Sequence, residues 1–190
     1  LVYGSIQNAT YPIFSNIQNQ HDRLINAYRK SIRFTSFLTF PLLIGGVMVA
    51  PALFRLLFKS EWWDAIPFFQ LLCMGGCFTV LTAINNNFIK VSGRSSGILR
   101  IEIVKMALTA VSIALLARES VLAMVAGLMA VRGVVHFINI YYTQCYTGYG
   151  MWAQLCDTVP YLLLAMVMAA AVWSLDLDVH NNNKKKTILI

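Results

Sequence analysis

The sequence has few charged residues, and acidic residues are especially scarce. Charged residues make up 12% of the 190 residues and hydrophobic residues 58%, whereas a soluble domain is about 25% charged and about 45–50% apolar. The formal net charge is +7. The basic residues are scattered between apolar blocks and form no patch with interleaved aromatics, so we do not expect a nucleic-acid partner. This composition is typical of a membrane-embedded protein.

Motifs that carry enzyme chemistry are also missing from the sequence. Its four cysteines, Cys73, Cys77, Cys145 and Cys156, form no CxxC pair. No group of His, Cys or carboxylate residues has metal-ligand spacing. The sequence contains no phosphate-binding glycine loop and no serine nucleophile elbow. We therefore expect no catalytic residue, no metal and no cofactor.

Long apolar runs take up most of the chain. A membrane-spanning helix needs about 20 mostly apolar residues. The segments that meet this standard are residues 34–58, 66–90, 98–117, 120–142 and 158–175. The sequence predicts an all-α, polytopic transmembrane bundle over residues 34–175, with about five full spans and partial helices at both ends.

The flanking segments are expected to belong to further helices. Residues 1–18 have the pattern of the end of a preceding membrane helix, and residues 176–190 that of a polar tail leading into another helix. The chain begins without Met and no signal peptide precedes it. We therefore expect an internal piece of a longer protein.

Residues 19–33 form a basic, amphipathic segment. Apolar and basic side chains fall on opposite faces of a helix over this segment. The apolar face carries Leu24, Ala27, Tyr28 and Ile32, and the basic face carries Arg23, Arg29, Lys30 and Arg33. The pattern favours a cytoplasmic linker helix on an anionic membrane surface over a solvated connector.

The distribution of basic residues predicts the orientation of the spans. The connections at 19–33 and 90–100 are rich in Lys and Arg, whereas those at 58–64 and 117–119 mix basic with acidic residues. The positive-inside rule places the first two in the cytoplasm. Trp62 and Trp63 then lie at the opposite interface, as an aromatic belt would. The run Lys184–Lys186 conflicts with this orientation, because it falls on the outer side.

Three predicted spans carry polar residues at helical spacing, so that each has one polar face. These faces are Thr79, Thr82, Asn86 and Lys90; Glu102, Lys105, Thr109 and Ser112; and Arg132, His136, Asn139 and Thr143. An Arg near the middle of a span costs about 2.5–3.5 kcal/mol on insertion scales. Arg132 is therefore expected to face protein or water.

Each polar face alone has a structural explanation. Glu102 and Lys105 can pair on one helix, Lys105 can extend to the interface, and Asn and Thr can join helices. Three such faces together favour a shared polar cavity open to the cytoplasm. Its predicted lining is Arg132, Lys105, Glu102, Asn86, His136, Asn139, Thr82 and Lys90. A cationic lining of this kind suits an anionic phosphate head group.

The first half of the sequence also resembles a known family. The matching segments are 11–18 (YPIFSNIQ), 22–24 (DRL), 27–31 (AYRKS), 41–45 (PLLIG), 50–53 (APAL), 56–58 (LLF), Trp62, 65–72 (AIPFFQLL) and 90–94 (KVSGR). With these segments the chain resembles the polysaccharide flippases of the multidrug/oligosaccharidyl-lipid/polysaccharide exporter superfamily, of the Wzx and WzxC type. It departs from the pattern at Lys59-Ser60, where many such proteins have Gly.

This resemblance implies the second half of a pseudo-symmetric transporter in the bacterial inner membrane. It implies that an undecaprenyl-pyrophosphate-linked oligosaccharide is moved by alternating access, during synthesis of O-antigen, capsule or exopolysaccharide. The expected partners are membrane lipids, this substrate and a coupling ion, H⁺ or Na⁺. It implies a transporter rather than an enzyme.

Other functions remain open at this stage. A drug/cation antiporter of the same superfamily should have an anionic cavity, whereas Arg132 and Lys105 outnumber Glu102 here. A membrane-embedded polysaccharide polymerase or ligase should have a large periplasmic loop, and no predicted connection is long. A purely structural subunit would leave the three polar faces unexplained.

Overall fold

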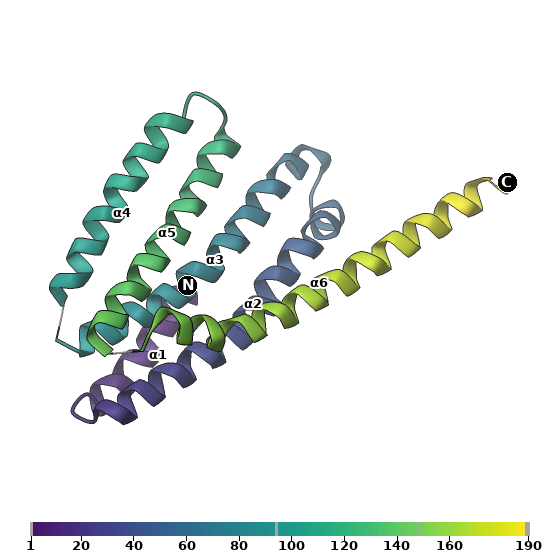
Figure 1. The fold of residues 1–190 in the computed structure, drawn as a ribbon. Helices are drawn as coiled ribbons and strands as arrows, with labels where there is room; N and C mark the ends of the chain where they lie inside the picture. Colours follow the sequence, from purple (N-terminus) through teal and green to yellow (C-terminus); the bar gives the residue numbers. More distant parts are fainter. Residues whose placement is uncertain (1, 94, 148, 189–190) are drawn as a thin grey trace.

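The chain is built from helices in a computed structural model that describes residues 2–93, 95–147 and 149–188. In chain order these are α1 (Val2–Asn16), α2 (His21–Leu57), the short 3₁₀ helix η1 (Ser60–Ala65), α3 (Ile66–Val91), α4 (Ser95–Leu116), α5 (Val121–Thr147) and α6 (Met151–Ile188) (Figure 1). The described residues contain no strand. The predicted all-α class is confirmed.

Four stretches among the described residues are long and apolar enough to cross a membrane. They are His21–Leu57, Ser60–Val91, Val121–Cys145 and Met151–Ser174. Helix α4, the third predicted span, has 22 residues but is not among them, because its first half contains Arg100, Glu102 and Lys105. The polytopic helical bundle is confirmed, and those three charges distinguish α4 from the other predicted spans.

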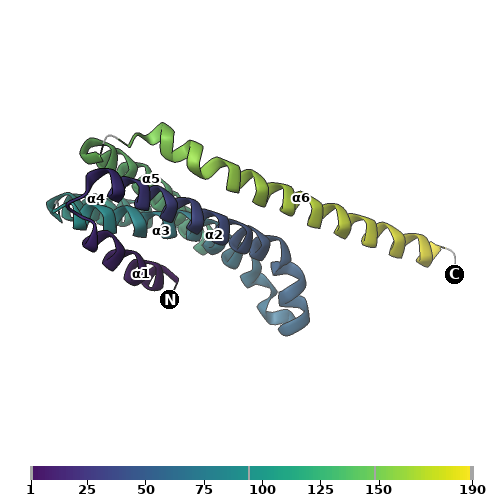
Figure 2. The ribbon, with the colours of Figure 1, turned by 90° about the horizontal axis from the view of Figure 1, so that it is seen from below.

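Two helices are longer than the spans expected from hydropathy. Residues 21–33 and the span that begins at residue 34 form one continuous helix of 37 residues, α2, which contains Pro41 and Pro51. Helix α6 has 38 residues, and its C-terminal part extends away from the other helices in both views (Figures 1 and 2). Residues 189 and 190, part of the predicted start of a further helix, lie outside the described residues.

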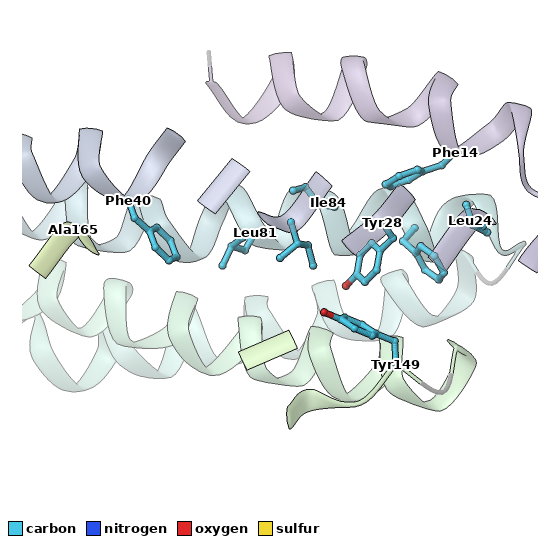
Figure 3. Packing of buried hydrophobic residues seen from close by; sticks show 10 residues of the cluster. Phe14, Leu24, Tyr28, Phe40, Leu81, Ile84, Tyr149 and Ala165 are labelled. Carbon is cyan, nitrogen blue, oxygen red and sulfur yellow. The ribbon is translucent and has the colours of Figure 1, made fainter. Parts of the chain in front are cut away.

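Helix α3 is the centre of the bundle. It packs against α1 and α2 on one side and against α4 and α5 on the other, while α6 packs mainly against α2. An apolar cluster joins α1, α2, α3 and α6 and includes Phe14, Tyr28, Ile84 and Ala165 (Figure 3). Burial of such side chains provides the packing that holds the helices together.

Three consecutive buried asparagines on α3 face different neighbours. Asn85 Oδ1 accepts a 2.5 Å hydrogen bond from the hydroxyl of Tyr28 on α2. The next residue, Asn86, borders a pocket between α3, α4 and α5. Asn87 Nδ2 donates to Thr10 Oγ1 of α1 at 2.7 Å. Since an α-helix turns by about 100° per residue, a helix surrounded on all sides can direct three successive polar side chains towards three different neighbours.

Glycines mark the closest approach of α5 to its neighbours. A Cβ atom added at Gly75 of α3 would collide with Met129 of α5. One added at Gly127 of α5 would collide with Leu116 and Ser112 of α4. Small residues at such positions let membrane helices pack closely.

This packing predicts different effects for two glycines of α5. Gly127→Ala should destabilise the protein by about 1–3 kcal/mol, the usual cost of overpacking. Gly133→Ala is the matched control, because its Cβ would lie 3.8 Å from Phe78, an ordinary contact, and Ala favours a helix over Gly by about 1 kcal/mol. Thermal unfolding in detergent measures both, and equal midpoints for the two variants would contradict the packing described.

Candidate functional site

A pocket of about 510 Å³ lies between helices α3, α4 and α5. Its lining is Thr79, Thr82 and Asn86 from α3, Glu102, Lys105 and Thr109 from α4, and Leu128, Val131, Arg132 and Val135 from α5. The 3–4 residue spacing on each helix directs one side-chain row towards the pocket. The polar faces of the three helices thus meet around one space.

The structure brings five of the eight predicted cavity residues to this pocket. They are Thr82, Asn86, Glu102, Lys105 and Arg132. Sequence analysis missed three apolar lining residues of α5, Leu128, Val131 and Val135. Their signal was present, since Leu128 and Val135 lie four and three residues from Arg132 on the same helix face, and Val131 directly precedes Arg132.

The other three predicted residues do not line the pocket. His136 is buried, and its Nδ1 lies 3.2 Å from Thr82 Oγ1. Asn139 is completely buried. Lys90 lies in the last turn of α3 with its side chain exposed. His136 thus contacts a lining residue, Asn139 follows the lining residue Val135 by about one turn of α5, and Lys90 stands at the end of α3.

The pocket has an excess of positive charge. Its charged lining residues are Arg132, Lys105 and Glu102, which sum to a formal charge of +1. Lys105 Nζ pairs with the Glu102 carboxylate one turn earlier, and both side chains are about 40% exposed. Ion pairs this exposed contribute about 0–1 kcal/mol, so Lys105 can exchange Glu102 for another anion at little cost.

Arg132 has no carboxylate partner among the residues that the structure describes. Its Nη1 donates a 3.1 Å hydrogen bond to Thr79 Oγ1 on α3, and its side chain is exposed to the pocket. Guanidinium groups bind phosphate and carboxylate oxygens with two parallel hydrogen bonds. The arrangement leaves most of the donors of Arg132 available for such an anion.

Helices α3 and α5 run side by side in a constant parallel register. Arg132 contacts Thr79, and His136 contacts Thr82, so the partners are 53 and 54 residues apart. Gly75 and Met129, which touch one turn earlier, are in the same register. This regularity explains why polar faces recognised separately in the sequence come together.

A second polar cluster, which sequence analysis missed, joins α2 to α6. Asp157 of α6 is buried and accepts hydrogen bonds from Arg29 Nε at 2.9 Å and from Arg33 Nη2 at 2.5 Å. The hydroxyl of Tyr149 also donates to this carboxylate. Arg29 lies over the Tyr149 ring, 5.3 Å from its centroid. In the sequence, this cluster was signalled only by Asp157, an isolated acidic residue among mostly apolar neighbours.

Tyr149 acts as a donor in this cluster over the whole physiological pH range. Burial and the hydrogen bond to Asp157 raise the pKa of Tyr149 well above its usual value. Its ring lies edge-on to Tyr28, with centroids 5.6 Å apart (Figure 3). The Tyr28 hydroxyl continues the network to Asn85, which also receives a 3.4 Å hydrogen bond from Gln154 Nε2 of α6.

These contacts change the role of two basic residues. Arg29 and Arg33, assigned from the sequence to the basic face of an amphipathic linker helix at the membrane surface, both contact Asp157. Arg23 donates to Gln20, and Lys30 is exposed. The helical part of the segment is present in α2, and its position on a membrane surface stays a prediction.

Comparisons with known proteins agree on one class of membrane protein. A family described as "Polysaccharide biosynthesis protein" matches residues 1–67. A membrane protein in the cps region of Klebsiella pneumoniae is 30% identical over 76 residues, which is 40% of this chain and 16% of that protein. WzxC of Escherichia coli K12, a lipopolysaccharide biosynthesis protein, is 31% identical over 71 residues, 37% of this chain and 14% of WzxC. The resemblance to proteins of polysaccharide biosynthesis, WzxC among them, is confirmed.

A third relative extends the match to a Gram-positive bacterium. TuaB of Bacillus subtilis, a teichuronic acid biosynthesis protein, is 26% identical over 90 residues, 47% of this chain and 19% of TuaB. No solved structure matches. The chain therefore spans less than a fifth of each of these relatives. The family match ends at residue 67, before the first pocket residue, Thr79, so the pocket's role rests on its chemistry.

The cluster around Asp157 predicts a stability defect. Asp157→Asn removes the charge that Arg29 and Arg33 share, and should cost about 1–3 kcal/mol, the range for hydrogen bonds to charged groups. The lower part of this range is expected because the two arginines are 38% and 46% exposed. Thermal unfolding in detergent measures the loss.

Asp22→Asn is the control, because Asp22 is exposed in the first turn of α2 and should contribute less than about 1 kcal/mol through the helix dipole. The double variant Asp157→Asn/Arg29→Gln should be less destabilised than the sum of its single variants. Additive losses would show that the two residues do not act as a pair.

Proposed function

We propose that this chain is part of a transporter that carries a lipid-linked oligosaccharide across the bacterial inner membrane for polysaccharide synthesis. The observation that carries the proposal is the positively charged pocket between α3, α4 and α5 in a multi-span helical protein. The relatives' roles in capsule-region, teichuronic acid and lipopolysaccharide synthesis support a polysaccharide-related cargo. The proposed substrate class is an undecaprenyl-pyrophosphate-linked oligosaccharide.

In this proposal the pocket binds the pyrophosphate group. Arg132 supplies a guanidinium whose free donors fit phosphate oxygens, and Lys105 adds a second positive charge. Glu102 holds Lys105 while the pocket is empty, and the phosphate then replaces the Glu102 carboxylate. Exchange of one anion for another limits the desolvation cost that a bare Lys would carry within the membrane.

Transport by alternating access would carry the bound head group past the bilayer centre. Arg132 lies near the middle of α5 (Val121–Thr147), where a bound phosphate would be farthest from both aqueous phases. Polar transporter sites near the bilayer midplane are a general feature of such proteins. Coupling to H⁺ or Na⁺ would supply the driving force and forms part of the proposal.

Two features disfavour the alternative functions, the positive charge of the pocket and the short connections between the helices. A drug/cation antiporter would place its cationic cargo beside Arg132 and Lys105, at a cost in repulsion. A polysaccharide polymerase or ligase would need a large extramembrane loop, whereas the helices here are joined by short connections. We therefore propose a transporter rather than an enzyme.

Replacing the pocket arginine tests the proposal directly. Arg132→Gln keeps a hydrogen-bond donor but removes the charge, and transport of the lipid-linked oligosaccharide should fall at least about tenfold, as expected when a charged hydrogen bond is lost. Arg132→Lys should retain part of the activity, because it restores the charge without the planar fork. Flipping in proteoliposomes gives the rate.

Arg118→Gln is the matched control, since Arg118 is exposed between α4 and α5, far along α5 from Arg132. It should transport at the wild-type rate. If Arg132→Gln folds with an unchanged melting temperature and also transports normally, the pocket does not bind the cargo's phosphate.

The orientation of the chain is tested by labelling engineered cysteines from outside the cell. In a background without the four native cysteines, Ser92→Cys should react with a membrane-impermeant thiol reagent only after the membrane is opened. Ser60→Cys should react in intact spheroplasts. Both serines are exposed, one after α3 and one at the start of η1. The reverse pattern would show that the basic connections lie outside.

A further inference from the structure

Two buried carboxamides next to the pocket have side-chain atoms without a partner among the described residues. Asn86 is 4% exposed and its Oδ1 makes no hydrogen bond, and Asn139 is fully buried with neither Oδ1 nor Nδ2 bonded. Buried polar groups in folded proteins nearly always have a partner. These three atoms therefore indicate that something further binds beside them.

The register of α3 and α5 places these two residues together. Thr79 contacts Arg132 and Thr82 contacts His136, at offsets of 53 and 54 residues. One turn further along both helices, the same offset pairs Asn86 with Asn139. Asn86 lines the pocket, and Asn139 follows the lining residue Val135 by about one turn of α5, so the pair lies beside the pocket on the C-terminal side of Arg132.

The distance between the charged and neutral parts of the wall follows from helix geometry. Arg132 and Asn139 are seven residues apart on α5, which is about 10 Å along the helix axis. In the proposed orientation the asparagines lie closer to the cytoplasm than Arg132. A lipid-linked substrate in the cytoplasmic leaflet also has its phosphates nearer the bilayer centre than its sugars.

The unpartnered atoms select the chemistry of the ligand. Two are amide oxygens, which accept, and one is an amide nitrogen, which donates. A phosphate only accepts, and a metal cation would satisfy the oxygens alone, next to a pocket that is already positive. A hydroxyl group both donates and accepts, so it matches the full set.

We propose that Asn86 and Asn139 form a neutral subsite that binds sugar hydroxyl groups of the cargo, beside the phosphate held by Arg132 and Lys105. This inference rests on the proposed function and adds to it the recognition of the sugar. Water, which has the same hydrogen-bonding chemistry, occupies the subsite when no sugar is bound.

Binding of two lipids to the intact, detergent-purified protein tests the subsite. One is an undecaprenyl-pyrophosphate-linked oligosaccharide isolated from the source cells, and the other is undecaprenyl pyrophosphate without sugar. The wild-type protein should bind the sugar-bearing lipid more tightly. Asn86→Leu and Asn139→Leu should weaken its binding about five- to tenfold, the loss expected for one or two hydrogen bonds, and leave the sugar-free lipid unaffected.

Matched variants separate this effect from general damage. Asn87→Leu changes the same residue type one position further along, but Asn87 bonds to Thr10 of α1, so it should not change the preference between the lipids. Asn86→Ser, which keeps a hydroxyl, should lose less affinity than Asn86→Leu. Arg132→Gln should weaken binding of both lipids alike.

The possible failures are distinguishable. Equal wild-type affinity for the two lipids overturns the sugar subsite, and this measurement needs no variant to fold. Equal effects of Asn86→Leu on both lipids, or none, show that the pair holds structural water only. If the wild-type protein binds neither lipid, or if Arg132→Gln changes neither affinity, the proposed function itself fails.

Discussion

Polar groups inside a membrane need partners, and this requirement organises the structure. With no water in the hydrocarbon region, each unmatched donor or acceptor carries a high cost. Several hydroxyls are matched within their own helix: Thr39, Thr79 and Thr143 each donate to the backbone carbonyl four residues earlier. Larger polar side chains reach across to other helices instead. The requirement therefore separates residues that hold the bundle together from those that border open space.

The two polar systems differ in what they leave unsatisfied. The cluster of Asp157 with Arg29, Arg33 and Tyr149 joins α2 to α6 and saturates its carboxylate. The pocket system on the other side of α3 leaves Arg132 with free donors and Lys105 with an exchangeable partner. A saturated cluster suits a structural role, and an unsaturated one suits ligand binding. The saturated cluster and the pocket lie on opposite sides of the central helix α3.

The sequence was sufficient to predict the helical class and the pocket, because both depend on local periodicity. Apolar runs define spans, and a 3–4 spacing defines a helix face, so Thr82, Glu102 and Arg132 were found without knowing their neighbours. Helical spacing alone does not show whether a polar side chain on that face reaches the pocket or is buried between the helices beside it. For that reason His136 and Asn139, on the same predicted face as Arg132, proved to be buried in the wall.

Long-range pairing lay beyond such reasoning. Asp157 binds residues 128 and 124 positions earlier in the chain, and no local pattern encodes a partner at that distance. Arg29 and Arg33 consequently looked like a free basic surface. Helix α4 is less apolar than the other predicted spans for a different reason, since it carries Arg100 together with Glu102 and Lys105, which line the pocket.

The three successive asparagines of α3 have a consequence for how the bundle assembles. Asn85 and Asn87 receive or give hydrogen bonds to α2 and α1, while Asn86 faces α4 and α5. The residues on either side, Ile84 and Phe88, are apolar and buried. A neighbouring helix that shifted along α3 by one turn would meet mostly apolar side chains in place of its asparagine. The two bonded asparagines therefore fix the position along α3 at which α1 and α2 pack against it, while Asn86 remains directed to the pocket.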